Sequence, residues 1–220
     1  LARDPKRGMI RKLKELDLVG KRVFVRVDFN VPISQGRITE THRIESALPT
    51  LRSVAAKAKK VLIASHLGRP GGKRQPEWSL APVRDHLEQS LSCPVTLAPD
   101  CIGSEVEALV QDPHRKVILL ENLRFHKEEE ENDPVFSQTL ASLADVYIND
   151  AFGAAHRAHA SVEGITHCLP RAAAGLLMEK ELQYLGQVLE SPDRPFVALL
   201  GGAKVSDKLE VIENLLPKVD

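Results

Sequence analysis

A run of β-branched and aromatic residues near the N-terminus ends abruptly in polar residues, over positions 22–30 (RVFVRVDFN). Its apolar positions are nearly continuous: Val23, Phe24, Val25 and Val27. Such a strand is buried on both faces, which is typical of a parallel sheet covered by helices. Ligands of these sheets bind beyond the carboxyl ends of the strands. We therefore expect a ligand to meet Asp28 and Asn30.

Apolar strand patterns alternate with helical patterns along the rest of the chain. We expect strands at residues 22–27, 61–65, 95–97, 117–120, 146–149 and 196–200. We expect helices at residues 41–58, 80–91, 104–111, 134–143, 179–189 and 207–216, with Pro49 bending or breaking the first. Residues 161–177 are rich in alanine and fit neither pattern. The alternation predicts an α/β fold, a doubly wound parallel sheet flanked by helices in three layers.

Two prolines after the helix at 179–189, Pro192 and Pro195, suggest a domain boundary. Only about 25 residues follow, too few to bury a core of their own. We expect a first domain at 9–177, a connecting helix at 178–191, and at 192–220 the first strand and helix of an incomplete second domain, so that the chain looks truncated. Residues 1–8 precede Met9 without any pattern, and we expect them to be foreign to the natural chain.

Composition narrows the class of protein. Hydrophobic residues make up 43% and charged residues 27%, and the net charge is zero, so no global field attracts nucleic acid or a membrane surface. No apolar run approaches the roughly 20 residues of a membrane span, and the N-terminus lacks a signal peptide's apolar segment. The three cysteines are not in metal-ligand spacing, which favours free thiols in a cytoplasmic protein.

Five of the predicted strands are followed by residues suited to binding a phosphate or carboxylate. They are Asp28 and Asn30; His66 and Arg69; Arg124; His156 and Arg157; and Lys204 and Lys208. Arg43 opposes the dipole at the start of its helix, which also suggests a ligand. Guanidinium groups bind phosphate oxygens in pairs of hydrogen bonds, so the set predicts a phosphorylated small molecule. Asp28 would then accept from a hydroxyl or orient one of the arginines.

Taken one at a time, several of these residues also have an interpretation without any role in binding. Arg43 could be a solvated surface residue, and His66 could be a structural loop residue. His156 and His159 lack a third zinc ligand at sensible spacing. The acidic run at 128–131 predicts a solvated surface loop.

The segment after the last predicted strand resembles a phosphate-binding turn. Gly201 and Gly202 allow a ligand to approach the backbone closely, and Lys204 and Lys208 would share a helix face. The chain has neither G-x-x-x-x-G-K-[ST] nor G-x-G-x-x-G.

Five motifs in order resemble those of phosphoglycerate kinases. They are RVDFNVP at 26–32, SHLGRP at 65–70, ENLRF at 121–125, NDAFG with HRAH at 149–159, and LGGAKVSDK at 200–208. The resemblance implies transfer of the acyl phosphate of 1,3-bisphosphoglycerate to ADP, giving 3-phosphoglycerate and ATP, by a monomer that needs Mg²⁺ with its nucleotide. It assigns substrate binding to Asp28, Asn30, Arg43, His66, Arg69, Arg124 and Arg157.

The same resemblance places Arg43 nearest the transferred group, as a catalytic residue together with Lys208. Gly201, Gly202, Lys204 and Lys208 would face the nucleotide phosphates. The family has two domains of similar size, and the adenosine pocket and the acidic Mg²⁺ ligand would lie in the half that this chain lacks. We therefore expect these 220 residues to bind 3-phosphoglycerate without turnover. A non-catalytic domain that binds a phosphorylated metabolite is the alternative.

Overall fold

The computed structural model describes residues 10–190, 194–201 and 209–220. The chain divides into two compact units, Leu1–Glu179 and Lys180–Asp220, which we describe separately. None of the helices in the described ranges combines the length and the apolar character required to cross a membrane.

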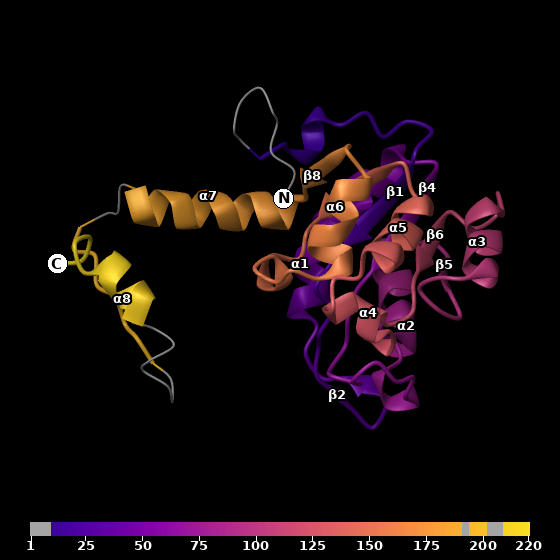
Figure 1. The fold of residues 1–220 in the computed structure, drawn as a ribbon, viewed down its shortest axis with the longest axis horizontal. Helices are drawn as coiled ribbons and strands as arrows, with labels where there is room; N and C mark the ends of the chain where they lie inside the picture. Colours follow the sequence, from indigo (N-terminus) through magenta and orange to yellow (C-terminus); the bar gives the residue numbers. More distant parts are fainter. Residues whose placement is uncertain (1–9, 191–193, 202–208) are drawn as a thin grey trace. The chain divides into compact units, whose positions relative to one another are not determined.

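The first unit is built on a six-stranded sheet in the order β5-β6-β4-β1-β7-β8 (Figure 1). The strands are β1 (Arg22–Arg26), β4 (Lys60–Ala64), β5 (Val95–Leu97), β6 (Val117–Leu119), β7 (Val146–Asn149) and β8 (Ala172–Ala174). Every pairing in this sheet is parallel. The prediction of a parallel α/β sheet is confirmed, and the 22–30 run supplies one of its two central strands.

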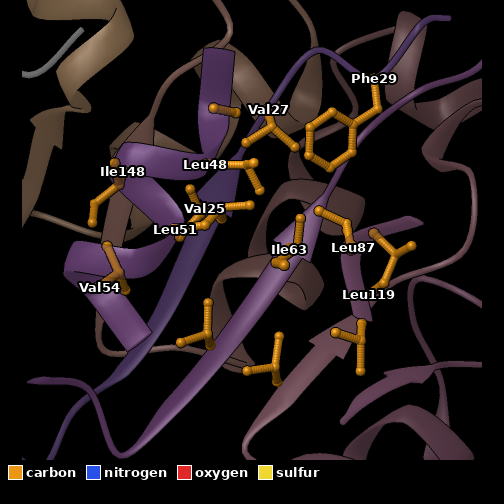
Figure 2. Close-up of a cluster of buried hydrophobic side chains, with 14 of the residues drawn as sticks. Val25, Val27, Phe29, Leu48, Leu51, Val54, Ile63, Leu87, Leu119 and Ile148 are labelled. Atoms are coloured by element: carbon orange, nitrogen blue, oxygen red, sulfur yellow. The ribbon is translucent and has the colours of Figure 1, made fainter. Parts of the chain in front are cut away.

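Residues that alternate along the strands face two separate hydrophobic clusters. Val23, Val25, Ile63, Leu119 and Ile148 pack against α1 (His42–Lys57) and α2 (Ala81–Leu91). Figure 2 shows this cluster, with Leu48, Leu51 and Val54 of α1 directed at the strands. Phe24, Leu62, Ile118 and Tyr147 face α3 (Ser104–Gln111), α5 (Pro134–Ser142) and α6 (Ile165–Cys168). The sheet therefore lies between two helical layers, as expected.

Shorter elements connect these layers. The strands β2 (Ile33–Ser34) and β3 (Arg37–Ile38) form an antiparallel hairpin. Its turn residues Gln35 and Gly36 both have positive φ, which matches the right-handed twist of the two strands. The remaining short helices are η1 (Leu13–Glu15), η2 (Pro76–Trp78), η3 (Leu123–Phe125), α4 (Lys127–Glu130), η4 (Phe152–Ala154) and the π-helix η5 (Ala160–Gly164).

The structure of this unit differs from the sequence pattern at Pro49 and in the alanine-rich stretch. Pro49 lies inside α1 without breaking it, because the buried face formed by Ile44, Leu48 and Leu51 holds both halves of the helix on the sheet. The alanine-rich stretch contains β8. Its three alanines lie opposite Tyr147, Ile148 and Asn149 of β7. Alanine has little preference for strands, so β8 forms because it is buried beside β7 and not because of its sequence pattern.

The second unit contains most of α7 (Leu176–Glu190) and all of α8 (Leu209–Leu215). The strand predicted at 196–200 is wrong, since these residues have no strand conformation. A lone parallel strand has nothing to pair with, and the described part of this unit offers no neighbouring strand. The segment is held instead by Asp220, which accepts from the Phe196 N–H at 2.7 Å and pairs with Arg194 at 2.7 Å.

Candidate functional site

The register of the sheet brings four predicted loops together at the carboxyl edge. Arg26 lies opposite Ala64 on one side and Asn149 on the other, so the segments after β1, β4 and β7 start side by side. The Leu123 N–H donates to the Ser65 carbonyl at 3.2 Å, which draws in the segment after β6. The convergence of strand ends follows from the parallel topology itself.

Asp28 and Asn30 together join the segments after β1, β4 and β7. Asp28 Oδ2 accepts from Arg43 Nη1 at 2.5 Å. The same oxygen would lie 2.9 Å from a Cβ at position 153, so Gly153 leaves room for this carboxylate. Its other oxygen accepts from the Asn30 N–H at 3.2 Å, and Asn30 Oδ1 accepts from the Gly68 N–H at 2.8 Å. Asp28 and Arg43 are therefore already oriented by each other.

Arg124 is buried, with 4% of its surface exposed. Its Nη1 donates to the Gly68 carbonyl at 2.8 Å. Its Nε lies 3.3 Å from a Glu130 oxygen but makes no hydrogen bond, so this contact is one of charge alone. Burial lowers the pKa of Arg124, and Arg157 and Arg26 act in the same direction. Such a guanidinium gains from an anion that brings both negative charge and acceptors.

Asn122 fixes the turn that positions Arg124. Its side-chain amide donates to the carbonyls of Leu67 and Trp78 at 2.7 and 2.9 Å. Its Oδ1 accepts from the N–H groups of Leu67 and Arg124 at 3.2 and 3.1 Å. This one buried side chain couples the loop after β4 to the loop after β6.

His66 is 7% exposed, and Arg26 Nη2 lies 3.2 Å from its Nδ1. Burial first, then the charges of Arg26, Arg124, Arg157 and His159, lower the pKa of His66 to about 2. Burial and the neighbouring arginines likewise lower the pKa of His159 to about 4. Both imidazoles are neutral at pH 7, because burial and the neighbouring positive charges both disfavour the protonated ring.

Of the remaining predicted residues, one joins this cluster, some do not, and three lie outside the described residues. Arg157 is exposed, yet its charge acts on His66 and Arg124, so it belongs to the same cluster. Arg69 is exposed and forms no hydrogen bond or ion pair with the described residues. Gly201 lies exposed in an irregular segment, and Gly202, Lys204 and Lys208 lie outside the described residues.

The acidic run at 128–131 is a correction to the sequence interpretation. Glu129 is fully buried, whereas Glu130 and Glu131 are exposed. The Glu129 carboxylate accepts from the Ser161 N–H and hydroxyl at 2.9 and 2.6 Å. Burial raises the pKa of Glu129, and the charge of Arg26 opposes that rise. One carboxylate of the run is therefore a counter-charge beneath the cationic cluster and not part of a solvated loop.

Sequence reasoning also missed Arg26 and Ser161. Arg26 is 1% exposed and its Nε donates to Ser161 Oγ at 2.8 Å. A charged residue inside an otherwise apolar strand was the available signal, because arginine is almost never fully buried without a partner. Ser161 lies in the alanine-rich stretch and carried no comparable signal.

Elsewhere in the first unit, three side chains form a group that could hold a metal ion. Ligand atoms of Asp100, Cys101 and His126 are all within 4.8 Å of one another. Linear spacing concealed this group, since His126 comes from a different loop. His126 Nε2 and Asp100 Oδ1 are hydrogen-bonded at 2.7 Å. Burial raises the pKa of the Cys101 thiol. Its sulfur and nitrogen donors do not fit Mg²⁺, which prefers oxygen ligands.

Comparisons with known proteins agree with these motifs. The phosphoglycerate kinase family profile matches residues 13–220. Phosphoglycerate kinases of Solibacter usitatus and Moorella thermoacetica are 57% and 58% identical to this chain, each over 94% of it and over 54% and 53% of their own lengths. The chain thus spans about half the length of the curated relatives it matches.

Solved structures give the same result. Phosphoglycerate kinase from Coxiella burnetii has a TM-score of 0.82 and 40% identity, covering 96% of this chain and 53% of that one. The enzyme from Pyrococcus horikoshii has a TM-score of 0.83 and 33% identity, covering 95% and 53%. With its parallel sheet, its loop motifs and a profile match over nearly its whole length, this chain belongs to the phosphoglycerate kinase family.

Proposed function

We propose that this chain is the 3-phosphoglycerate-binding half of a phosphoglycerate kinase. The observation that carries the proposal is the cluster of cations at one edge of the sheet, where burial first, and then the charges of Arg26, Arg124 and Arg157, oppose protonation of His66. An anion with several charges would relieve this repulsion. A phosphate ester and a carboxylate on one small molecule match that need.

The substrate residues of the proposal are those predicted from the sequence: Asp28, Asn30, Arg43, His66, Arg69, Arg124 and Arg157. Arg69, Arg124 and Arg157 bind the 3-phosphate. Arg43, held by Asp28, lies nearest the transferred phosphoryl group. Gly201, Gly202, Lys204 and Lys208 belong to the nucleotide side.

In the full-length enzyme, the acyl phosphate of 1,3-bisphosphoglycerate passes to ADP, or the reverse from ATP to 3-phosphoglycerate. The acceptor is already an oxyanion in both directions, so the reaction needs no general base. Catalysis then consists of positioning and of neutralising charge on the moving phosphoryl group by Arg43 and Lys208. Mg²⁺ bound with the nucleotide would supply further neutralisation.

Domain boundaries at 9–177, 178–191 and 192–220 remain part of the proposal, as do a monomeric state and a cytoplasmic location. Free thiols at Cys93, Cys101 and Cys168 agree with a reducing compartment. Because the chain spans about half of its relatives, we expect no turnover from these 220 residues alone.

Titration calorimetry with 3-phosphoglycerate and, separately, ATP tests this proposal. We expect 3-phosphoglycerate to bind the chain. We expect Arg69→Ala and Arg124→Ala each to weaken that binding about tenfold. Lys208→Ala is the control and should leave it unchanged. A coupled kinase assay that detects turnover by the 220-residue chain would contradict the expected inactivity.

A titration and a kinase assay of the full-length protein address the alternative of a non-catalytic phosphometabolite-binding domain. That alternative gains support only if the full-length protein also binds 3-phosphoglycerate and has no kinase activity.

A further inference from the structure

Arg26 is enclosed beneath the candidate site, and its contacts fix the guanidinium in one orientation. Its Nε donates to Ser161 Oγ at 2.8 Å, and its Nη1 donates to the Val27 carbonyl. The remaining nitrogen, Nη2, lies 3.2 Å from Nδ1 of His66. Three partners on three sides leave this buried group little rotational freedom.

The contacts of Ser161 are equally determined. Its hydroxyl lies 2.6 Å from Glu129 Oε1 and its N–H lies 2.9 Å from Oε2. Since a carboxylate only accepts, the hydroxyl proton points to Glu129 and the Oγ lone pairs remain for Arg26 Nε–H. Glu129 is therefore both the counter-charge of the buried arginine and the group that sets the direction of the serine hydroxyl.

The direction of the last contact follows from the chemistry of arginine. A guanidinium has five N–H donors and no acceptor. Nδ1 of His66 must therefore accept, and in a neutral imidazole the proton then lies on Nε2. We propose that Glu129, Ser161 and Arg26 are positioning residues that lock His66 as the Nε2–H tautomer, so that it donates one hydrogen bond to an oxyanion of the substrate.

Other features of the site agree with this role. Within the described residues no protein group accepts from His66 Nε2, and part of the surface of this nitrogen is open to solvent. Burial and the neighbouring arginines keep the His66 ring neutral in the free chain by lowering its pKa. The arginines supply the charge, and His66 supplies a directed neutral donor.

The inference deepens the proposed function and rests on it for the identity of the oxyanion. The locked tautomer, in contrast, is a property of the free chain and is measurable without any ligand. The two can therefore fail separately.

Long-range ¹H–¹⁵N correlation spectra of the uniformly labelled 220-residue chain report which ring nitrogen of each histidine carries the proton. For His66 at pH 7 we expect Nε2 protonated and Nδ1 at the shift of an unprotonated acceptor nitrogen. Protonation at Nδ1, or a charged ring, would overturn the inference.

Variants then test the chain of contacts. Arg26→Met keeps an unbranched, shorter side chain and removes the donor to Nδ1, so we expect a mixture of tautomers. Ser161→Ala removes the partner of Arg26 Nε and should shift the tautomer ratio in the same direction. If His66 still carries its proton only on Nε2 in either folded variant, the proposed chain of contacts does not set the tautomer.

Tyr147→Phe is the matched control. The Tyr147 hydroxyl donates to the Ser161 carbonyl at 2.9 Å, so this variant perturbs the same buried residue without touching its Oγ. We expect the tautomer to stay pure there.

In titrations with 3-phosphoglycerate, Arg26→Met should lose affinity in proportion to the fraction of His66 that no longer carries the Nε2 proton, and Tyr147→Phe should lose none. If the wild type shows the tautomer but does not bind 3-phosphoglycerate, the lock stands and the proposed function fails.

Discussion

Arg43 and Asp28 form a direct ion pair at the carboxyl edge of the sheet, with Nη1 2.5 Å from Oδ2. The two residues come from different elements: Asp28 follows β1 and Arg43 lies in the first turn of α1. A cation in that turn opposes the helix dipole, and the carboxylate offsets this cost. The pair explains why an acidic residue belongs to a site that we propose for an anionic substrate.

Removing that carboxylate should release Arg43. We expect Asp28→Ala to weaken 3-phosphoglycerate binding by about five- to tenfold, since the arginine must then be ordered by the ligand itself. The free energy of unfolding should change by less than about 1 kcal/mol, because the arginine is half exposed. Calorimetry and urea denaturation measure the two effects.

Asp85→Ala provides the control, since Asp85 is an exposed aspartate paired with Arg84 at 2.8 Å on α2. Equal losses of affinity in both variants would mean that general charge, and not the orientation of Arg43, is what matters.

Gly68 should tolerate no side chain. Its φ is +61°, and a Cβ there would lie 2.1 Å from a ring carbon of Trp78. We expect Gly68→Ala to cost about 3 kcal/mol or more of unfolding free energy and to abolish binding, because strain and overpacking add. Gly71 has a similar φ of +65° and open space around it. Gly71→Ala should cost only about 1 kcal/mol, and equal costs at the two positions would rule out the clash with Trp78.

Asn122 should be the most sensitive polar residue of the site. Replacement by alanine removes four hydrogen bonds and leaves the partner groups of two loops without their buried amide. We expect a loss of about 3 kcal/mol in unfolding free energy. Chemical denaturation checks this, and a loss below about 1 kcal/mol would show that water replaces the amide at little cost.

The free energy of unfolding should decrease as the pH is lowered through the range in which His66 becomes protonated in the unfolded chain. Folded His66 stays neutral down to about pH 2, because burial and Arg26, Arg124, Arg157 and His159 all oppose its charge. The unfolded chain takes up a proton below about pH 6.5, so the contribution is complete above that pH and is lost on acidification.

His66→Asn removes this titration. Relative to that variant, the wild type should lose about 1.6 kcal/mol of unfolding free energy between pH 6.5 and pH 5. A difference that does not depend on pH would mean that His66 protonates freely in the folded state.

The sequence predicted the fold where the pattern and the packing agree. Residues 104–111 and 146–149 match α3 and β7 residue for residue, because the first has its apolar residues at helical spacing and the second is a short apolar run that ends in a polar residue. The pattern failed at Ala172–Ala174, where burial beside β7 decides the conformation, and at 196–200, where no described strand is available to pair.

Some residues of the candidate site were likewise predictable from the sequence, and others were not. Asp28, Arg43, His66 and Arg124 were predictable because each follows a strand end or opens a helix, and the parallel topology brings them together. Glu129 and Ser161 were not, since only the folded chain reveals that one glutamate of an acidic run is buried against an arginine of the central strand. Contacts between distant segments have no signature in local sequence.

The most direct test of the central claim is a crystal structure of this chain with 3-phosphoglycerate at saturating concentration. Our account predicts ligand density at the carboxyl edge of the sheet, with the phosphate contacting Arg124 and Arg157 and an oxyanion within hydrogen-bond distance of His66 Nε2. Density elsewhere on the molecule, or an empty edge in a chain that binds the ligand in solution, would contradict it.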